Sequence, residues 1–178
     1  MNLKGIRWPV AAAVFIACLA IFWGANYLRQ KQFVEEPLLQ ALENMAEVEQ
    51  VTLGRKGKSL EIRLQVRKLE DYPRFHRMVE EAVSDLYRGH YSLNLDEAPD
   101  PAIEAAYGKI HLAVFEAMDR GNYVDMGSYV TETGTHYGLD RCRVEILETH
   151  VYLTLENGEA FLYRRFPRKS VGGKILYD

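Results

Sequence analysis

Cysteine is scarce in this chain of 178 residues, with only Cys18 and Cys142 present. Cys18 lies inside a long apolar run, so Cys142 is the one cysteine of the remaining, more polar sequence. That remainder has no pair of thiols to form an intramolecular disulfide, and its stability must come from a packed core. The 146 residues after Gln32 are enough for one ordinary domain, or for two very small ones.

Charge is missing from one stretch near the N-terminus. From Trp8 to Leu28, 21 residues carry no formal charge. As a helix rising about 1.5 Å per residue, this run extends roughly 31 Å, which matches the hydrocarbon thickness of a bilayer. Trp8 stands at one end and Trp23 and Tyr27 near the other, where amphipathic rings favour the membrane–water interface. The sequence therefore predicts a retained transmembrane helix.

Two other interpretations of the apolar run stay open. Cleavage at Cys18-Leu19-Ala20 would make the run a secretory signal, but the new terminus would then begin with apolar residues. Phe15-Ile16-Ala17-Cys18 resembles a lipoprotein signal in which Cys18 becomes the anchor, although Phe15 is a poor first residue for it. We expect the retained span, with a lipoprotein as the next alternative.

The basic residues that flank the run indicate its orientation. Lys4 and Arg7 precede it, and Arg29 and Lys31 follow it, so the terminal amine is the one extra positive charge on the N-terminal side. The sequence favours a cytoplasmic N-terminus, with the C-terminal domain extracytoplasmic.

Acidic residues are absent from the first 32 positions and abundant afterwards. These positions hold four of the 22 basic residues and none of the 25 acidic ones, so the remainder has 18 basic and 25 acidic residues, a formal charge of −7. Nucleic-acid binding needs a basic surface, and this balance argues against it.

Periodicity beyond the apolar run predicts a mixed α+β domain. Residues 59–67, SLEIRLQVR, alternate strictly between apolar and polar side chains, which indicates a strand with one buried and one solvated face. The expected order is helix, strand, strand, helix and strand, over residues 37–45, 48–53, 59–67, 71–88 and 90–95.

This α-β-β-α-β order, over about Glu36 to Glu97, resembles the small ring-building domains of bitopic proteins in secretion and sporulation channels. The resemblance is one of element order. It implies a three-stranded sheet packed against two helices, in a protein that assembles with other copies.

A third helix is predicted from Asp100-Pro101 to Gly121, followed by strands that form a C-terminal antiparallel hairpin or meander. The strands cover residues 141–147, 150–155 and 160–165, and Asn157-Gly158 supplies the two positive-φ positions of a type I′ turn. The expected domain boundaries are an N-terminal tail (1–7), the span as a signal anchor (8–28), a juxtamembrane linker (29–36), the α+β domain (37–166, with 37–97 and 100–166 as potential sub-units) and a flexible basic tail (167–178).

Gly121 to Gly138 is rich in glycine, threonine and tyrosine and lacks periodicity. We expect an irregular loop there, with at most a short helix near Tyr123 to Tyr129. Its hydroxyl groups make it the candidate binding loop for a phosphate or sugar, through Ser128, Thr131, Thr133 and Thr135.

No constellation of catalytic residues is present in the sequence. The five histidines lack the spacing of a zinc site, and no P-loop, nucleophile elbow or supported cysteine–histidine pair occurs. The acidic loop around Asp96, Glu97 and Asp100 is explained by the helix that follows it, since acids favour a helix N-terminus. We predict neither an enzyme nor a cofactor or metal site.

Two groups of residues are candidate interaction surfaces. Basic side chains that could contact an anionic surface lie in the first hairpin turn and near the C-terminus: Arg55, Lys56, Lys58, Arg164, Arg165, Arg168 and Lys169. Small residues that could let two spans pack closely share one stripe of the apolar run: Ala13, Ala17, Ala20 and Gly24.

The sequence favours a single-pass membrane protein whose extracytoplasmic α+β domain acts by protein interaction or envelope assembly rather than catalysis. Its expected partners are the lipid bilayer and either a second protein or further copies of this chain. The alternatives are a ligand-sensing module that uses residues 121–138, or a lipoprotein anchored at Cys18.

Overall fold

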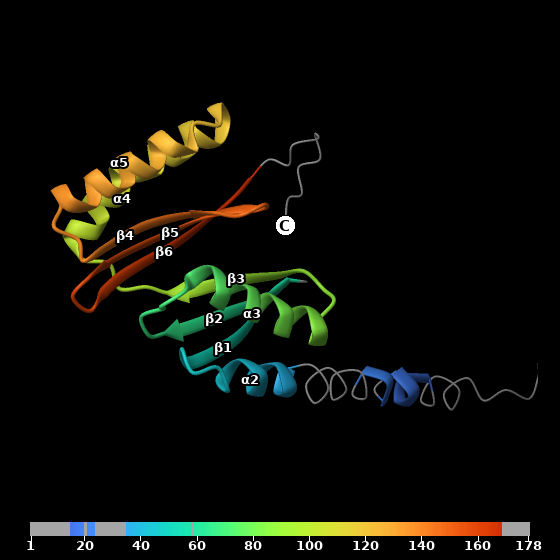
Figure 1. The fold of residues 1–178 in the computed structure, drawn as a ribbon. Helices are drawn as coiled ribbons and strands as arrows, with labels where there is room; N and C mark the ends of the chain where they lie inside the picture. Colours follow the sequence, from blue (N-terminus) through green and yellow to red (C-terminus); the bar gives the residue numbers. More distant parts are fainter. Residues whose placement is uncertain (1–14, 20, 24–34, 58, 169–178) are drawn as a thin grey trace, which may run out of the picture.

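The computed structural model describes residues 15–19, 21–23, 35–57 and 59–168 (Figure 1). These residues form two three-stranded sheets with helices on their faces, so the chain is of mixed α+β class, as the sequence predicts. No helix in the described ranges is both long and apolar enough to cross a membrane. Most of the predicted span, Trp8 to Leu28, lies outside the described residues.

The first half of the domain confirms the predicted α-β-β-α-β order. Its elements are α2 (Glu36–Glu43), β1 (Val48–Lys56), β2 (Ser59–Val66), α3 (Tyr72–Leu86) and β3 (Tyr91–Asp96). In this first sheet, the central strand β2 is antiparallel to β1 and parallel to β3. The apolar side chains of β2 are buried against α2 and α3, while Arg63 and Gln65 are exposed. The predicted half-buried strand is confirmed.

The second half contains two long helices and an antiparallel meander. Its elements are α4 (Pro101–Arg120), α5 (Tyr123–His136), β4 (Arg141–Ile146), β5 (His150–Asn157) and β6 (Ala160–Pro167). The second sheet has the order β4-β5-β6, and α4 and α5 cover one of its faces (Figure 1). The Asp100 carboxylate accepts a hydrogen bond from the Ile103 N–H at 2.8 Å and caps α4, which ends at Gly121 with φ of 78°.

The expectation of an irregular loop between Gly121 and Gly138 is wrong, because α5 occupies most of this stretch. Gly134 shows why the glycine content misleads. A Cβ built on Gly134 would lie 2.2 Å from the Cβ of Cys142 on β4. The glycine lets the helix lie directly on the strand, and such a close approach cannot be recognised from local sequence.

The turn between β5 and β6 is shifted by one residue from the prediction. Asn157 pairs with Ala160, so Gly158 and Glu159 are the two turn residues. Gly158 has φ of 53°, and no non-glycine residue in the described chain has a positive φ. This is the pattern of a type II′ turn, with glycine at its first central position, and not of the predicted type I′ turn.

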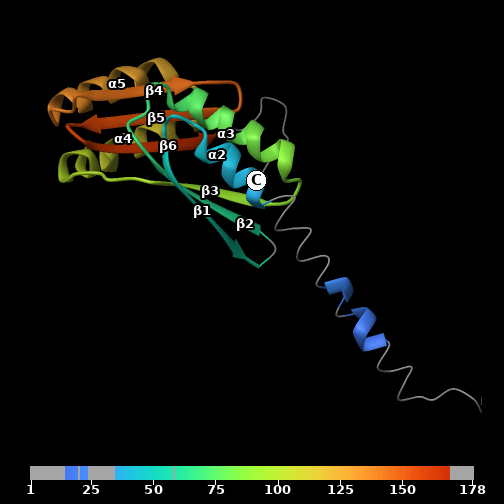
Figure 2. The ribbon, with the colours of Figure 1, turned by 90° about the horizontal axis from the view of Figure 1, so that it is seen from below.

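The second sheet joins the two halves of the domain. Along β5, Val151 to Glu156 are all buried, because one face of the strand packs against α4 and α5 and the other against the first half (Figures 1 and 2). Leu153 lies in the core beneath the two long helices, whereas Tyr152 and Tyr163 belong to the core of the first half. Residues 37–97 and 100–166 thus build two hydrophobic clusters that share the second sheet.

Candidate functional site

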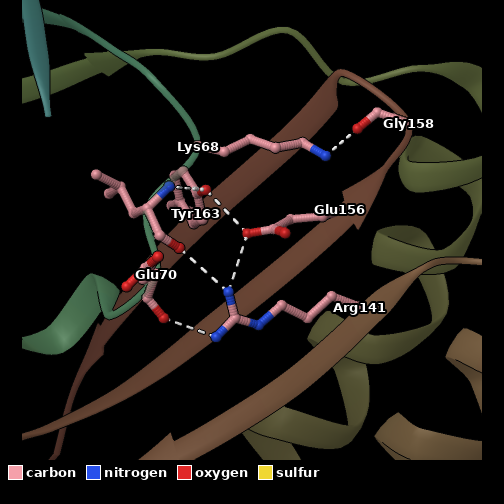
Figure 3. A network of polar contacts seen from close by, with 7 residues as sticks. Lys68, Glu70, Arg141, Glu156, Gly158 and Tyr163 are labelled. Atoms are coloured by element: carbon pink, nitrogen blue, oxygen red, sulfur yellow. Dashed lines mark hydrogen bonds and ion pairs between the residues drawn. The ribbon is translucent and has the colours of Figure 1, made fainter.

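Arg141, at the start of β4, connects the two halves of the domain through polar contacts (Figure 3). Its guanidinium donates to the carbonyl oxygen of Glu70 at 2.7 Å and to that of Leu69 at 3.2 Å, and it lies 3.5 Å from the Glu156 carboxylate. The segment that leads from β2 into α3 is thereby held against the second sheet.

The Tyr163 hydroxyl completes this network. It accepts a hydrogen bond from the Leu69 N–H at 2.8 Å and donates to the Glu156 carboxylate at 3.0 Å (Figure 3). Burial raises the pKa of Tyr163 above its ordinary value, so the hydroxyl keeps its proton at neutral pH. Lys68 adds a hydrogen bond to the carbonyl oxygen of Gly158 in the β5–β6 turn (Figure 3). The relative position of the two sheets is therefore defined on this side.

On another side the two sheets come together edge to edge. In the described chain, β3 is the last strand of the first sheet and β6 the last strand of the second. Ala98, two residues beyond the end of β3, forms an isolated antiparallel bridge with Phe161 of β6, in which the Phe161 N–H donates to the carbonyl oxygen of Ala98 at 3.2 Å. Away from this bridge the two strands diverge (Figure 1).

A groove with a volume of about 460 Å³ lies between the diverging strands, and we call it the edge groove. Leu93–Leu95 of β3 and Tyr163–Arg165 of β6 form its walls, α3 contributes Tyr72 and His76, and Glu97 adds a carboxylate near the bridge. Tyr72 and His76 are both almost completely buried. The groove thus combines two strand edges with a mostly polar lining.

Each arginine of the edge groove already has a carboxylate partner. Arg164 pairs with Glu97, and Arg165 donates to Glu80 at 2.7 Å. Burial alone would lower the pKa of Arg164, but the contacts with Glu97 outweigh it and raise this pKa. The Nδ1 atom of His76 lies 3.5 Å from a carboxylate oxygen of Glu80, but it forms no hydrogen bond of acceptable geometry. The contact with His76 and the charge of Arg165 lower the pKa of Glu80 despite its partial burial.

The direction of the backbone groups along the groove follows from the strand pairing. The Leu60 N–H donates to the carbonyl oxygen of His90 at 2.9 Å, and Leu60 stands opposite Tyr91. In a parallel pair of this register, every second residue of β3, including Asn94 and Asp96, bonds to β2. The N–H and C=O groups of Leu93 and Leu95 therefore point away from β2, towards the groove.

The edge of β6 shows the matching alternation. Phe161 donates its N–H to Ala98, and Tyr163 donates its N–H to the Glu97 carboxylate at 3.0 Å, so these groups point away from β5. Arg165, two residues further on, has the same direction because strand residues alternate. Two rows of outward backbone groups, one on β3 and one on β6, thus line the groove.

The hydroxyl residues of the candidate binding loop lie on α5 and do not gather in a cavity. Ser128, Thr131 and Thr135 direct their hydroxyl groups to the carbonyl oxygens four residues earlier, at 3.4, 3.1 and 3.0 Å. Thr133 is buried in the helix–sheet interface. These contacts are internal to the helix and its packing, so they provide no geometric support for a shared ligand site.

The basic residues do not share one surface. Arg55 pairs with Glu35 at 3.1 Å in the first hairpin, where Lys56 is exposed. Near the C-terminus, Arg164 and Arg165 line the edge groove, whereas Arg168 bonds to the carbonyl oxygen of Leu147 and lies over the Tyr123 ring at 5.0 Å. Two further candidates, Lys58 and Lys169, lie outside the described residues.

Only part of the predicted small-residue stripe is described. Ala17 is exposed on a helical segment, and Ala13, Ala20 and Gly24 lie outside the described ranges, as do Trp8 and Tyr27. Trp23 is exposed. Among the described residues, no three histidine, cysteine or acidic side chains form a group that could hold a metal ion.

Sequence reasoning missed most of the edge groove. It singled out Arg164 and Arg165 for their charge and assigned Glu97 to the start of the following helix, whereas Glu97 pairs with Arg164 in the groove, and it did not identify Tyr163 or His76. One signal was available, since two arginines stand next to each other within a predicted strand, and charged residues on a buried strand need partners. The partner residues lie 67 and 85 positions away in sequence, so only the fold could identify them.

Comparison of the chain with protein-family models, with curated proteins and with solved structures finds no match. The resemblance of residues 36–97 to ring-building domains is therefore limited to their element order. The site must be interpreted from its own geometry.

Proposed function

We propose that this chain is a non-catalytic interaction protein whose edge groove binds an extended segment of another polypeptide by β-strand addition. The observation that carries the proposal is the convergence of two strand edges, β3 and β6, on one groove. An exposed strand edge presents unpaired N–H and C=O groups, which are a template for a further strand. A strand placed between β3 and β6 would join the two sheets.

The contacts of Tyr163 show which groups pair with the outward backbone of β6 when no peptide is bound. Its N–H donates to the Glu97 carboxylate, and its carbonyl oxygen accepts a hydrogen bond from Arg164 at 3.0 Å. An adjacent strand would supply a carbonyl oxygen and an N–H at these same positions. The Glu97–Arg164 pair therefore takes the place of a strand at the centre of the β6 edge, and a peptide would displace it.

The lining indicates which peptides would fit. Leu93 and Leu95 offer half-buried apolar surface, whereas Arg164 and Arg165 offer guanidinium groups next to it. Side chains alternate between the two faces of a strand, so one face of the bound segment can be apolar and the other acidic. An acidic residue would take over Arg164 once Glu97 is displaced, because an arginine next to a carboxylate forms a strong charge-assisted pair.

The test is selection of short random peptides on the full chain in lipid nanodiscs, followed by backbone methylation of the selected peptides. We expect methylation of the amides that face β3 or β6 to weaken binding about five- to tenfold each, as for the loss of one hydrogen bond of about 1–1.4 kcal/mol. Methylation of the intervening amides should have no comparable effect. A peptide that binds equally well with every amide methylated would contradict strand addition.

A variant of the chain provides the matching test from the protein side. Leu95→Pro removes an outward N–H without touching the β2 ladder, in which Asn94 and Asp96 take part, and proline is tolerated at a strand edge. We expect it to weaken peptide binding, whereas Leu95→Val, which retains the N–H, should bind the same peptides. Unchanged binding by a folded Leu95→Pro protein would exclude β3 from the site.

We further propose that the apolar run from Trp8 to Leu28 anchors the domain to a membrane, with the domain on the extracytoplasmic side. The support is the length of the uncharged run and the aromatic residues near its ends. Protease treatment of intact cells should remove a C-terminal epitope tag from a full-length, membrane-bound band. A tag protected until lysis would reverse the orientation, and a shorter band would indicate cleavage or a lipoprotein anchored at Cys18.

A further inference from the structure

The outward face of α4 carries a stripe of residues that do not belong to the core. Residues 105, 108, 112, 115 and 119 follow one another at alternating steps of three and four and are all exposed. The core side of the helix is formed by other residues: Ile103, Ala106, Ile110, Val114 and Ala117. The 3–4 spacing is that of the contact positions of helices that pack along their length. We call these five positions the α4 stripe.

The α4 stripe contains two large apolar side chains with unusually high exposure. Leu112 is 62% exposed and Phe115 is 55% exposed, although Phe115 touches the Phe166 ring with one edge. They are neighbours on one face of the helix, since they are three residues apart. Folding of a single chain leaves this apolar surface in water.

Gly108 lies in the same stripe, in the interior of a 20-residue helix. A Cβ added to it would meet no described atom within 4 Å, so packing inside the chain does not require a glycine there. Glycine destabilises a helix interior relative to alanine. Contacts within the single chain do not explain a glycine at this position. Close packing of a second molecule against the helix would explain it.

The stripe is complementary to itself. A two-fold axis through Leu112, perpendicular to the helix, places Leu112 against its counterpart and Gly108 against Phe115 of the second copy, so that the open space at the glycine accepts the ring. Ala105 then faces Asp119 of the second copy. Small residues oppose large ones on both sides of the axis.

Charged residues beside the stripe are also complementary under the same two-fold axis. The axis brings Lys109 opposite Glu116 of the second copy, and the reverse pair follows by symmetry. Glu116 and Asp125 line a hollow of about 430 Å³ between α4 and α5, together with Lys109 and Leu112 of the same chain. With a second copy in place, two carboxylates face the two ammonium groups at each end of the contact. A parallel pairing would place Lys109 against Lys109 and Glu116 against Glu116.

We propose that the α4 stripe is the contact surface between two copies of this chain, packed antiparallel about a two-fold axis at Leu112. The contact shares no residue with the edge groove, which lies between β3 and β6. Two copies joined in this way keep both grooves open.

The axis makes a prediction that cysteine cross-linking can test on the full chain. In a Cys18→Ser background, Leu112→Cys should form a disulfide with itself under mild oxidation, because the two Cβ atoms face each other across the axis. Ala105→Cys should not cross-link with itself, since antiparallel packing separates the two copies of this residue by 14 helix positions, about 21 Å. Mixing Ala105→Cys protein with Asp119→Cys protein should restore a cross-linked band.

Controls separate this contact from others. Val124→Cys is on α5 and 84% exposed, and it should remain uncross-linked, as should the parent with only Cys142. Leu112→Glu should reduce the measured mass of the detergent-solubilised chain to that of a monomer. If association passes instead through the apolar run, Ala20→Leu or Gly24→Leu reduces the mass, and Leu112→Glu has no effect.

Cross-linking of Ala105→Cys with itself, or absence of the Leu112→Cys dimer at concentrations where the parent is dimeric, would overturn the antiparallel contact. A monomeric parent chain would also overturn it. Peptide binding to the edge groove should be unchanged in Leu112→Glu, so the two proposals can fail separately.

Discussion

The central strands of the two sheets, β2 and β5, differ in how many of their faces are buried. In β2, apolar residues are buried on one face, and the opposite face holds exposed residues such as Arg63 and Gln65. In β5, every residue from Val151 to Glu156 is buried, whatever its polarity. The second sheet is therefore the structural centre of the domain. The first sheet packs against it through helix α3 and leaves one face in solvent.

This comparison predicts how alanine substitutions act along each strand. At neighbouring positions of β5, Tyr152→Ala and Leu153→Ala should each destabilise the protein by about 3 kcal/mol, because each side chain fills one of the two cores. In β2, Leu64→Ala should cost about the same, but Arg63→Ala less than about 0.5 kcal/mol. Chemical denaturation measures all four. An equal loss at Arg63 would mean that the first sheet also has a second covered face.

A smaller but sharper effect is expected where α5 meets the second sheet. Gly134→Ala places a Cβ 2.2 Å from the Cβ of Cys142 and should destabilise by about 1–3 kcal/mol. Gly127, on the same helix, has no described atom within 4 Å of an added Cβ. Gly127→Ala should therefore stabilise by roughly 0.5–1 kcal/mol. Thermal unfolding of both variants gives the sign, and the double variant Gly134→Ala, Cys142→Gly should recover part of the loss.

The ion pairs of the two regions should also differ in how much they stabilise the folded protein. Arg141→Ala removes the contacts to Glu70 and Leu69 and leaves Glu156, which is 8% exposed, without its cation, so we expect a loss of about 1–2 kcal/mol. Arg67→Ala, which breaks an exposed pair with Glu49 on the first sheet, should cost less than about 0.5 kcal/mol. Similar losses in the two variants would show that the Arg141 network does not hold the halves together.

The smallest expected effect concerns pH. The pKa of Glu80 is lowered in the folded state by the contact with His76, with Arg165 acting in the same direction. A lowered pKa means that the stabilisation is complete above the ordinary carboxyl value of about 4.5 and is lost as the pH falls through the lower folded pKa. Glu80→Gln should flatten the acid limb of the stability curve. An unchanged acid limb in this variant would place the pH dependence in other carboxylates.

Much of the first half could be predicted because its signals are local. The strand predicted from the alternation of residues 59–67 is confirmed as β2. The helix predicted to begin at residue 71 is confirmed as α3, and the Asp71 carboxylate caps it by accepting a hydrogen bond from the Arg74 N–H at 2.8 Å. The end of α4 at Gly121 is confirmed for the same reason, since a left-handed residue terminates a helix without tertiary help. Spacing and capping act within a few residues of one another, so one sequence is enough to detect them.

The errors occurred where distant segments decide the local structure. From sequence alone, Gly134 is typical of a loop, and only the packing of α5 on β4 explains it. In the groove, Glu97 precedes the two long helices in sequence and Tyr163 follows them. The hydroxyl groups of Ser128 and Thr131 suggested a binding loop, but a helix directs them to its own carbonyl oxygens. The local composition of a segment shows which backbone conformations it can adopt. Which of them it adopts depends on contacts with segments distant in sequence.

Apolar periodicity and helix caps depend on short-range geometry, so one sequence was enough to predict the α+β class, the order of the elements in the first half and the solvated face of β2. The tertiary structure alone buries both faces of β5 and brings the edges of β3 and β6 together at one groove. It also decided that Leu112 and Phe115 remain outside the core. These features depend on how whole elements pack, and packing brings together residues that no local pattern connects.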